Sequence, residues 1–279
     1  MFECPYAKGW QDYMSASAAR ALTDTGAKAF YLDEYGFSRP DEACFNPTHG
    51  HAPGATPAGG ERQMMRAVRA AMDTVDPQAA LYIEEIPPDA NAPYVDGAFC
   101  YALNFSDEAL SPAKINLYRF AFPRLKLFDM VSAGINPTAM TAAEMKLSFF
   151  NGNGLWIKGD LDSWYSPEVR AFITKAHRAL REHSEAFTSD DLEPLVPTLA
   201  PGILANRFSS AKETVYTFYN RGFRTIRGRI LEIPPDLAGR KFVDLFTGKP
   251  LTTTQRDGGT FLEIEVAPRD VAAVGVISE

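Results

Sequence analysis

Two apolar segments of the sequence, each with the character of a β-strand, end abruptly on carboxylates. Residues 29–36 read Ala-Phe-Tyr-Leu-Asp-Glu-Tyr-Gly, and residues 80–88 read Ala-Leu-Tyr-Ile-Glu-Glu-Ile-Pro-Pro. A near-continuous apolar run is typical of a buried parallel strand, and the active sites of α/β folds gather at the carboxyl ends of such strands. The two acidic ends therefore predict acid/base or nucleophilic chemistry.

The alternation of side chains along a strand selects one carboxylate from each pair. Tyr31 and Asp33 are expected on one face and Glu34 on the other, and superposing the two segments matches Asp33 with Glu84. If the strands are neighbours, about 4.8 Å apart, these carboxylates approach the roughly 5–5.5 Å separation of retaining glycosidases. Asp33 is then the nucleophile and Glu84 the acid/base. Glu85 is the alternative to Glu84 for the acid/base role. The alternative is that the acids only cap helices or pair with basic residues.

The irregular stretch 37–60 contains further candidates in the sequence Cys-Phe-Asn-Pro-Thr-His-Gly-His, which includes Cys44, His49 and His51. A His-x-His pair near carboxylates is a possible metal site, but the sequence offers no third and fourth ligand at a familiar spacing. We therefore predict no metal and no cofactor. His49 and His51 are expected to bind sugar hydroxyls from a loop over the pocket, or to have no role.

Other strand ends add candidates for substrate binding. Asp129 ends the apolar run 125–128 and competes for the acid/base role, while Tyr101, Asn104 and Trp156 lie at the ends of other predicted strands. Flat aromatic rings suit the apolar face of a pyranose, although each such residue alone is more often part of the core.

The order of the predicted elements indicates parallel α/β units followed by an antiparallel part. Helical patterns at 10–25, 61–74, 114–120 and 141–149 alternate with strands at 29–33, 79–85, 97–103, 125–128 and 155–158. A long helix is expected over 167–187, with Ser166 as its N-cap and Thr25-Gly26 closing the first helix. Five short alternating strands are expected after the proline-rich stretch: 213–219, 225–230, 241–244, 260–266 and 271–277.

These patterns predict three parts: a catalytic (β/α) barrel portion at 1–188, a proline-rich linker at 189–201 and a C-terminal β-sandwich at 202–279. A closed (β/α)8 barrel needs eight strands, and the first part shows five. We therefore expect a TIM-type barrel that lacks its first strands, with a missing N-terminal half as a possible partner.

The chain resembles the (β/α)8 retaining α-glycosidases that include α-galactosidases and endo-α-N-acetylgalactosaminidases. The resembling segments are 26–33, 82–85, 149–154, 216–220 and 244–248. The resemblance implies hydrolysis of an α-linked sugar with retention, Asp33 being on the nucleophile strand. Two departures limit it. The strand 97–103 lacks the terminal Asp that α-galactosidases use as acid/base, whereas Glu84 fits the endo-α-N-acetylgalactosaminidase pattern better. The first strands of the barrel are also absent, so substrate contacts from that half do not carry over.

The charge composition of the chain limits the kinds of partner that it can bind. With a net charge of −7 and no cluster of Lys or Arg, the chain is not expected to bind nucleic acid or an anionic membrane. No apolar run reaches the ~20 residues of a membrane span, and no signal-peptide pattern opens the chain. The sequence does not decide in which cellular compartment the protein acts. Two other functions remain: a non-catalytic carbohydrate-binding protein, and a metal-dependent hydrolase of the amidohydrolase type that uses His49, His51 and the carboxylates.

Overall fold

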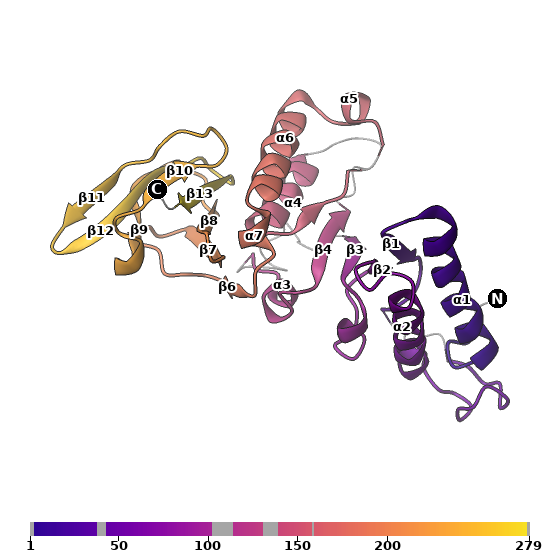
Figure 1. The fold of residues 1–279 in the computed structure, drawn as a ribbon. Coiled ribbons are helices and arrows are strands. Elements are labelled where there is room, and N and C mark those ends of the chain that lie inside the picture. The colour runs from indigo at the N-terminus through magenta and orange to yellow at the C-terminus, as the bar shows by residue number, and fades with distance from the viewer. Residues whose placement is uncertain (1–2, 38–42, 102–113, 131–138, 158, 278–279) are drawn as a thin grey trace. The chain divides into compact units, whose positions relative to one another are not determined.

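A computed structural model describes residues 3–37, 43–101, 114–130, 139–157 and 159–277 (Figure 1). The chain forms two compact units. The first contains residues 1–100 and 125–128, and the second contains residues 101–124 and 129–279. The predicted division at 188 and 201 stays a prediction.

The first unit is built on parallel strands in the order β1 (Ala29–Leu32), β2 (Ala80–Glu84), β3 (Gly97–Tyr101) and β4 (Lys126–Met130). β1 pairs with β2 in a register that sets Tyr31 against Tyr82. A backbone hydrogen bond of 2.9 Å from Lys126 N to Asp96 O continues the pattern. These four strands, which were predicted from apolar runs, are thus confirmed, each within two residues of its predicted ends.

Two helices accompany this sheet, α1 (Lys8–Thr25) and α2 (Ala58–Asp73), which contact each other along their length (Figure 1). α1 ends as predicted, since Gly26 adopts φ 67° and its N–H reaches Leu22 O at 3.0 Å. α2 buries Met64, Met65 and Val68. A short 3-10 helix, η1 (Ala92–Tyr94), precedes β3.

The second unit contains two antiparallel sheets. Five strands have the order β10-β13-β8-β7-β6, and three have the order β11-β12-β9. Their bounds are β6 Asp191–Glu193, β7 Ile203–Ser209, β8 Glu213–Asn220, β9 Ile226–Ile233, β10 Lys241–Asp244, β11 Thr253–Arg256, β12 Gly259–Val266 and β13 Val271–Ile277. Side chains from both sheets, among them Phe218 and Leu262, share one core, so the sheets pack against each other.

The remaining elements of the second unit are mainly helical. They are α3 (Leu117–Ala121), α4 (Ala139–Phe150), β5 (Gly154–Leu155), α5 (Leu161–Trp164), α6 (Pro167–Glu182), α7 (Ser184–Phe187) and the 3-10 helix η2 (Pro235–Leu237). The Ser166 N-cap is confirmed, because its side chain accepts from Val169 N at 3.3 Å. The single helix predicted over 167–187 is wrong in one respect: it breaks at His183, whose Nδ1 lies 2.6 Å from Glu213 Oε2.

The prediction of alternating strands is wrong for β8, which is buried along nearly its whole length. Phe149, Phe172 and Phe187, from the helical part, pack in one core with Val215 and Tyr219 of β8. Phe218 of the same strand packs in the core between the sheets. Because both faces of β8 are covered, its sequence has no polar face.

The fold is therefore mixed α/β, with one parallel and two antiparallel sheets. Among the described residues, no helix has both the length and the apolar character needed to cross a bilayer.

Candidate functional site

Asp33 and Glu84 lie at the carboxyl ends of two neighbouring parallel strands. The register pairs Leu32 with Ile83, so Asp33 and Glu84 occupy the next position on each strand. Their adjacency, which the sequence left conditional, is confirmed. Neighbouring strands lie about 4.8 Å apart, which suits carboxylates that act on the same bond.

The backbone after each carboxylate has the same unusual conformation. Glu34 has φ 60° and Glu85 has φ 59°, both in the left-handed region. This conformation costs a non-glycine residue roughly 1–2 kcal/mol, and such residues cluster at functional sites. The match shows that the two strand ends repeat one local structure, as the superposition of their sequences predicted.

Hydrogen bonds orient both acids. The Tyr31 hydroxyl donates to Asp33 Oδ1 at 3.1 Å, and the N–H of Glu34 donates to Glu84 Oε2 at 3.0 Å. Asp33 is exposed, whereas Glu84 is only 8% exposed. An accessible carboxylate thus follows one strand and a buried carboxylate ends its neighbour, an arrangement in which the first can attack and the second can exchange a proton.

An aromatic row covers the face of the sheet on which Tyr31 lies. The ring centroids of Tyr82 and Phe99 are 5.2 Å apart, those of Phe99 and Phe128 are 5.2 Å apart, and Tyr31 meets Phe99 edge-on at 5.4 Å. Burial, followed by the charge of Asp96, raises the pKa of Tyr82. The row fixes the strands that carry the two acids.

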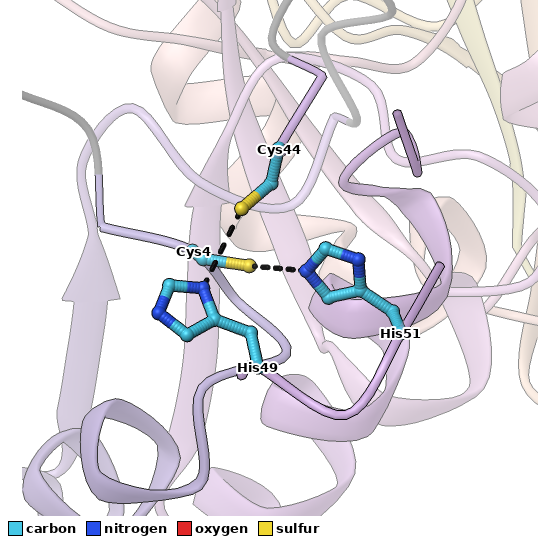
Figure 2. A group of neighbouring side chains, drawn as sticks. All are labelled: Cys4, Cys44, His49 and His51. Carbon is cyan, nitrogen blue, oxygen red and sulfur yellow. Dashed lines mark hydrogen bonds between the residues drawn. The ribbon is translucent and has the colours of Figure 1, made fainter. Parts of the chain in front are cut away.

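His49 and His51 lie in the loop between β1 and α2 and come together with two thiols. Cys4, from the segment before α1, and Cys44 complete a group whose ligand atoms all lie within 4.8 Å of one another (Figure 2). Sequence spacing does not point to Cys4 as a member, because it lies 40 positions before Cys44. Burial raises the pKa of the Cys4 thiol, and the neighbouring Cys44 acts in the same direction.

The other predicted site residues differ in their exposure and in their hydrogen-bond partners. Glu85 follows Glu84 and donates its backbone N–H to Phe99 O at 2.8 Å. Tyr101, at the end of β3, is 47% exposed, and Asn104 lies outside the described residues. Trp156, which belongs to the second unit, donates its backbone N–H to Asp129 O at 3.0 Å.

Asp129 has a second carboxyl group near it, that of Glu144, which no sequence motif marks. Asp129 is fully buried and its Oδ2 accepts a hydrogen bond from the Ser148 hydroxyl. Burial, followed by the charge of Asp129, raises the pKa of Glu144 on α4. Glu144 therefore holds its proton to a higher pH than an ordinary glutamate does.

Comparison with solved structures identifies the class of fold. The chain is similar to an α-amylase from Geobacillus thermoleovorans complexed with acarbose, with a TM-score of 0.61 and 13% identity over 96% of this chain and 64% of the amylase. It is also similar to α-galactosidase I from Mortierella vinacea, with a TM-score of 0.59 and 9% identity over 96% and 72% of the two chains. A GH27 β-L-arabinopyranosidase from Geobacillus stearothermophilus is also similar, with a TM-score of 0.58 and 12% identity. The match covers 98% of this chain and 63% of the arabinopyranosidase.

The chain thus shares the fold of part of these glycosidases and spans less than two thirds of the amylase and arabinopyranosidase chains. A family model described as a domain of unknown function, DUF6259, matches residues 1–108. No curated protein matches the chain.

Proposed function

We propose that this protein is a glycoside hydrolase that cleaves an α-linked sugar with retention of configuration. The observation that carries the proposal is the β1–β2 register, which sets Asp33 and Glu84 at adjacent strand ends. The similarity to an α-amylase and an α-galactosidase supports both the reaction class and the α linkage. We further propose that the parallel strands form part of a (β/α)8-type barrel.

In this mechanism the exposed carboxylate of Asp33 attacks the anomeric carbon and forms a covalent glycosyl-enzyme. Glu84 protonates the departing oxygen and then removes a proton from the water that releases the sugar. Tyr31 holds the Asp33 carboxylate through its hydroxyl, and the N–H of Glu34 holds that of Glu84. Glu85 and Asp129 are alternative acid/base groups.

Covalent labelling tests the nucleophile assignment. The full chain is incubated with α-configured cyclophellitol aziridines of several sugar types, digested and analysed by mass spectrometry. We expect label on the peptide that carries Asp33 and none in Asp33→Asn. The matched control is Asp24→Asn, an exposed Asp in the last turn of α1 that should be labelled as in the wild type.

Turnover of activated aryl α-glycosides gives a second measurement. Asp33→Asn should lower turnover at least about a thousandfold, because the covalent step loses its nucleophile. Unchanged turnover, or label on another carboxylate, overturns the assignment. Sugar binding by the wild type without turnover or labelling would favour the non-catalytic carbohydrate-binding alternative.

The amidohydrolase-type alternative receives less support. It requires His49 and His51 to act with carboxylates, whereas the structure places their rings beside the sulfur atoms of Cys44 and Cys4.

A further inference from the structure

Four side chains of the first unit direct their ligand atoms at a common point. Cys4 Sγ lies 3.3 Å from His51 Nε2, and Cys44 Sγ lies 3.4 Å from His49 Nδ1. Figure 2 shows both sulfur atoms and both rings turned toward one another. We propose that these residues bind one Zn²⁺ ion in a tetrahedral Cys2His2 site that ties the segment before α1 to the loop after β1.

The spacing suits a tetrahedral ion. Zinc bonds of about 2.3 Å to sulfur and 2.0–2.1 Å to nitrogen keep tetrahedral ligand atoms about 3.3–3.8 Å apart. The two measured contacts lie in that range, and no pair of the four atoms exceeds 4.8 Å. A pair at that limit needs to close by about 1.0–1.5 Å, which is within reach of side-chain rotation.

The far side of the His51 ring has the partner expected for a zinc ligand. Its Nδ1 lies 2.8 Å from the carbonyl oxygen of Ala52, which can only accept, so the proton of the neutral ring is on Nδ1. The lone pair of Nε2 then faces Cys4 Sγ. This backbone partner is the usual second contact of a metal-bound histidine, because it fixes the tautomer and the ring.

The far side of the His49 ring contacts Asn46. Its Nε2 lies 2.9 Å from Asn46 Nδ2, while Asn46 Oδ1 accepts from both the N–H and the hydroxyl of Thr48. Zinc binding through Nδ1 requires a proton on Nε2, so in the loaded site Asn46 must turn its oxygen to the ring. An Asp at this position offers an acceptor in either orientation.

The segment that carries Cys4 is held against the first turn of α2. A Cβ on Gly60 would lie 2.7 Å from the backbone nitrogen of Tyr6, so only glycine permits this approach. The Gln11 side chain donates to Pro5 O at 2.8 Å. Cys4, only 7% exposed, is therefore positioned by the backbone around it.

The loop between β1 and α2 places the other three ligands. A β-bridge joins Cys44 to Ala55, with Cys44 N donating to Ala55 O at 3.0 Å and Gly54 N to Cys44 O at 2.8 Å. His49 and His51 lie inside the turn that this bridge closes. A hollow of about 380 Å³, lined in part by Cys4, Cys44 and His49, gives an ion a path to the site.

The donor set favours zinc in a structural role. Two thiolates and two imidazoles in tetrahedral array are typical of Zn²⁺, and four protein ligands leave no position for a substrate. The ion would hold the loop that begins at Asp33 and would lower the freedom of the chain before α1.

The test measures zinc in the full chain, purified without a tag under reducing conditions. We expect about one zinc per chain in the wild type, and less than a tenth of that in Cys4→Ala, Cys44→Ala, His49→Gln and His51→Gln. Cys100→Ala and His177→Gln are matched controls, since they change the third cysteine and a histidine of the second unit, and should retain the metal. Asn46→Asp should also retain it.

Cobalt gives an independent readout on the wild type, which does not depend on the folding of the variants. Co²⁺ should produce thiolate-to-cobalt charge-transfer absorption and the intense visible bands of a tetrahedral site, and Zn²⁺ should abolish both. Zinc should also protect Cys4 and Cys44 from alkylation, and chelation should lower the unfolding midpoint by about 5 °C.

Three results overturn the proposal: a Cys4–Cys44 disulfide under these conditions, an octahedral cobalt spectrum, or equal zinc in the ligand variants and the wild type. The measurement does not rest on the proposed glycosidase activity. Asp33→Asn should keep its zinc, so failure of one proposal leaves the other intact.

Discussion

The carboxylate of Glu84 accepts a hydrogen bond from the backbone N–H of Glu34, with 3.0 Å between Oε2 and N. Glu34 directly follows Asp33, so the side chain at one strand end holds the turn at the other. Because Glu34 has a left-handed backbone, this bond helps to maintain a conformation that is costly for a non-glycine residue. The two acids are therefore coupled in structure as well as in the proposed chemistry.

Substitutions of Glu84 should separate its structural role from its chemical one. Glu84→Ala removes the acceptor of the Glu34 N–H and should lower the free energy of unfolding by about 1 kcal/mol. Glu84→Gln keeps an oxygen there and should lose less than about 0.5 kcal/mol, yet lose most of the turnover. Urea unfolding and aryl glycoside hydrolysis measure the two effects. Equal destabilisation by both substitutions would contradict the role assigned to this bond.

Tyr31→Phe should reduce turnover without unfolding the protein. The change removes the 3.1 Å hydrogen bond to Asp33 but keeps the ring and its edge-on contact with Phe99. We expect kcat/KM to fall about threefold to tenfold, which corresponds to the roughly 0.7–1.4 kcal/mol of one ordinary hydrogen bond. Tyr13→Phe, on the exposed side of α1, is the control. A wild-type rate in Tyr31→Phe would show that the hydroxyl does not position Asp33.

Glu144→Gln should stabilise the protein at neutral pH. Burial and the charge of Asp129 raise the pKa of Glu144 in the folded state, so the folded form binds this proton more tightly than the unfolded chain. Stability is therefore lost as the pH rises from the ordinary value of 4.5 through the raised pKa of the folded state. Thermal unfolding should give a higher midpoint for the variant at pH 7 and no gain near pH 4. A lower midpoint at pH 7 would show that ionised Glu144 makes a favourable contact.

The raised pKa of Tyr216 predicts that the free energy of unfolding falls at alkaline pH. Burial is the main cause that raises its pKa from 10.0 to about 12, so the folded state keeps a proton that the unfolded chain releases. Stability is complete below pH 10 and declines between pH 10 and about 12, by roughly 2–3 kcal/mol. Tyr216→Phe should flatten this decline in denaturant titrations. An unchanged slope would assign the alkaline loss to other groups.

Much of the parallel sheet and one relationship within the candidate site follow from local sequence. Strands of apolar residues that end in acids identified β1 and β2, and side-chain alternation matched Asp33 with Glu84. This succeeds because neighbouring parallel strands share a register, so equivalent sequence positions become equivalent positions in space. The same reasoning fails for β8, since the covering of both its faces depends on α4, α6 and the second antiparallel sheet.

The sequence by itself determined the acidic strand ends, the helix caps at Gly26 and Ser166, and the presence of Cys44, His49 and His51 in one loop. Only the tertiary structure brought Cys4 to that loop. The physical reason is range: backbone periodicity and capping act over a few residues, whereas the approach of Cys4 depends on the close packing of Tyr6 against Gly60 of α2. That contact joins segments with no shared pattern, and it turns a His-x-His pair into a four-ligand cluster.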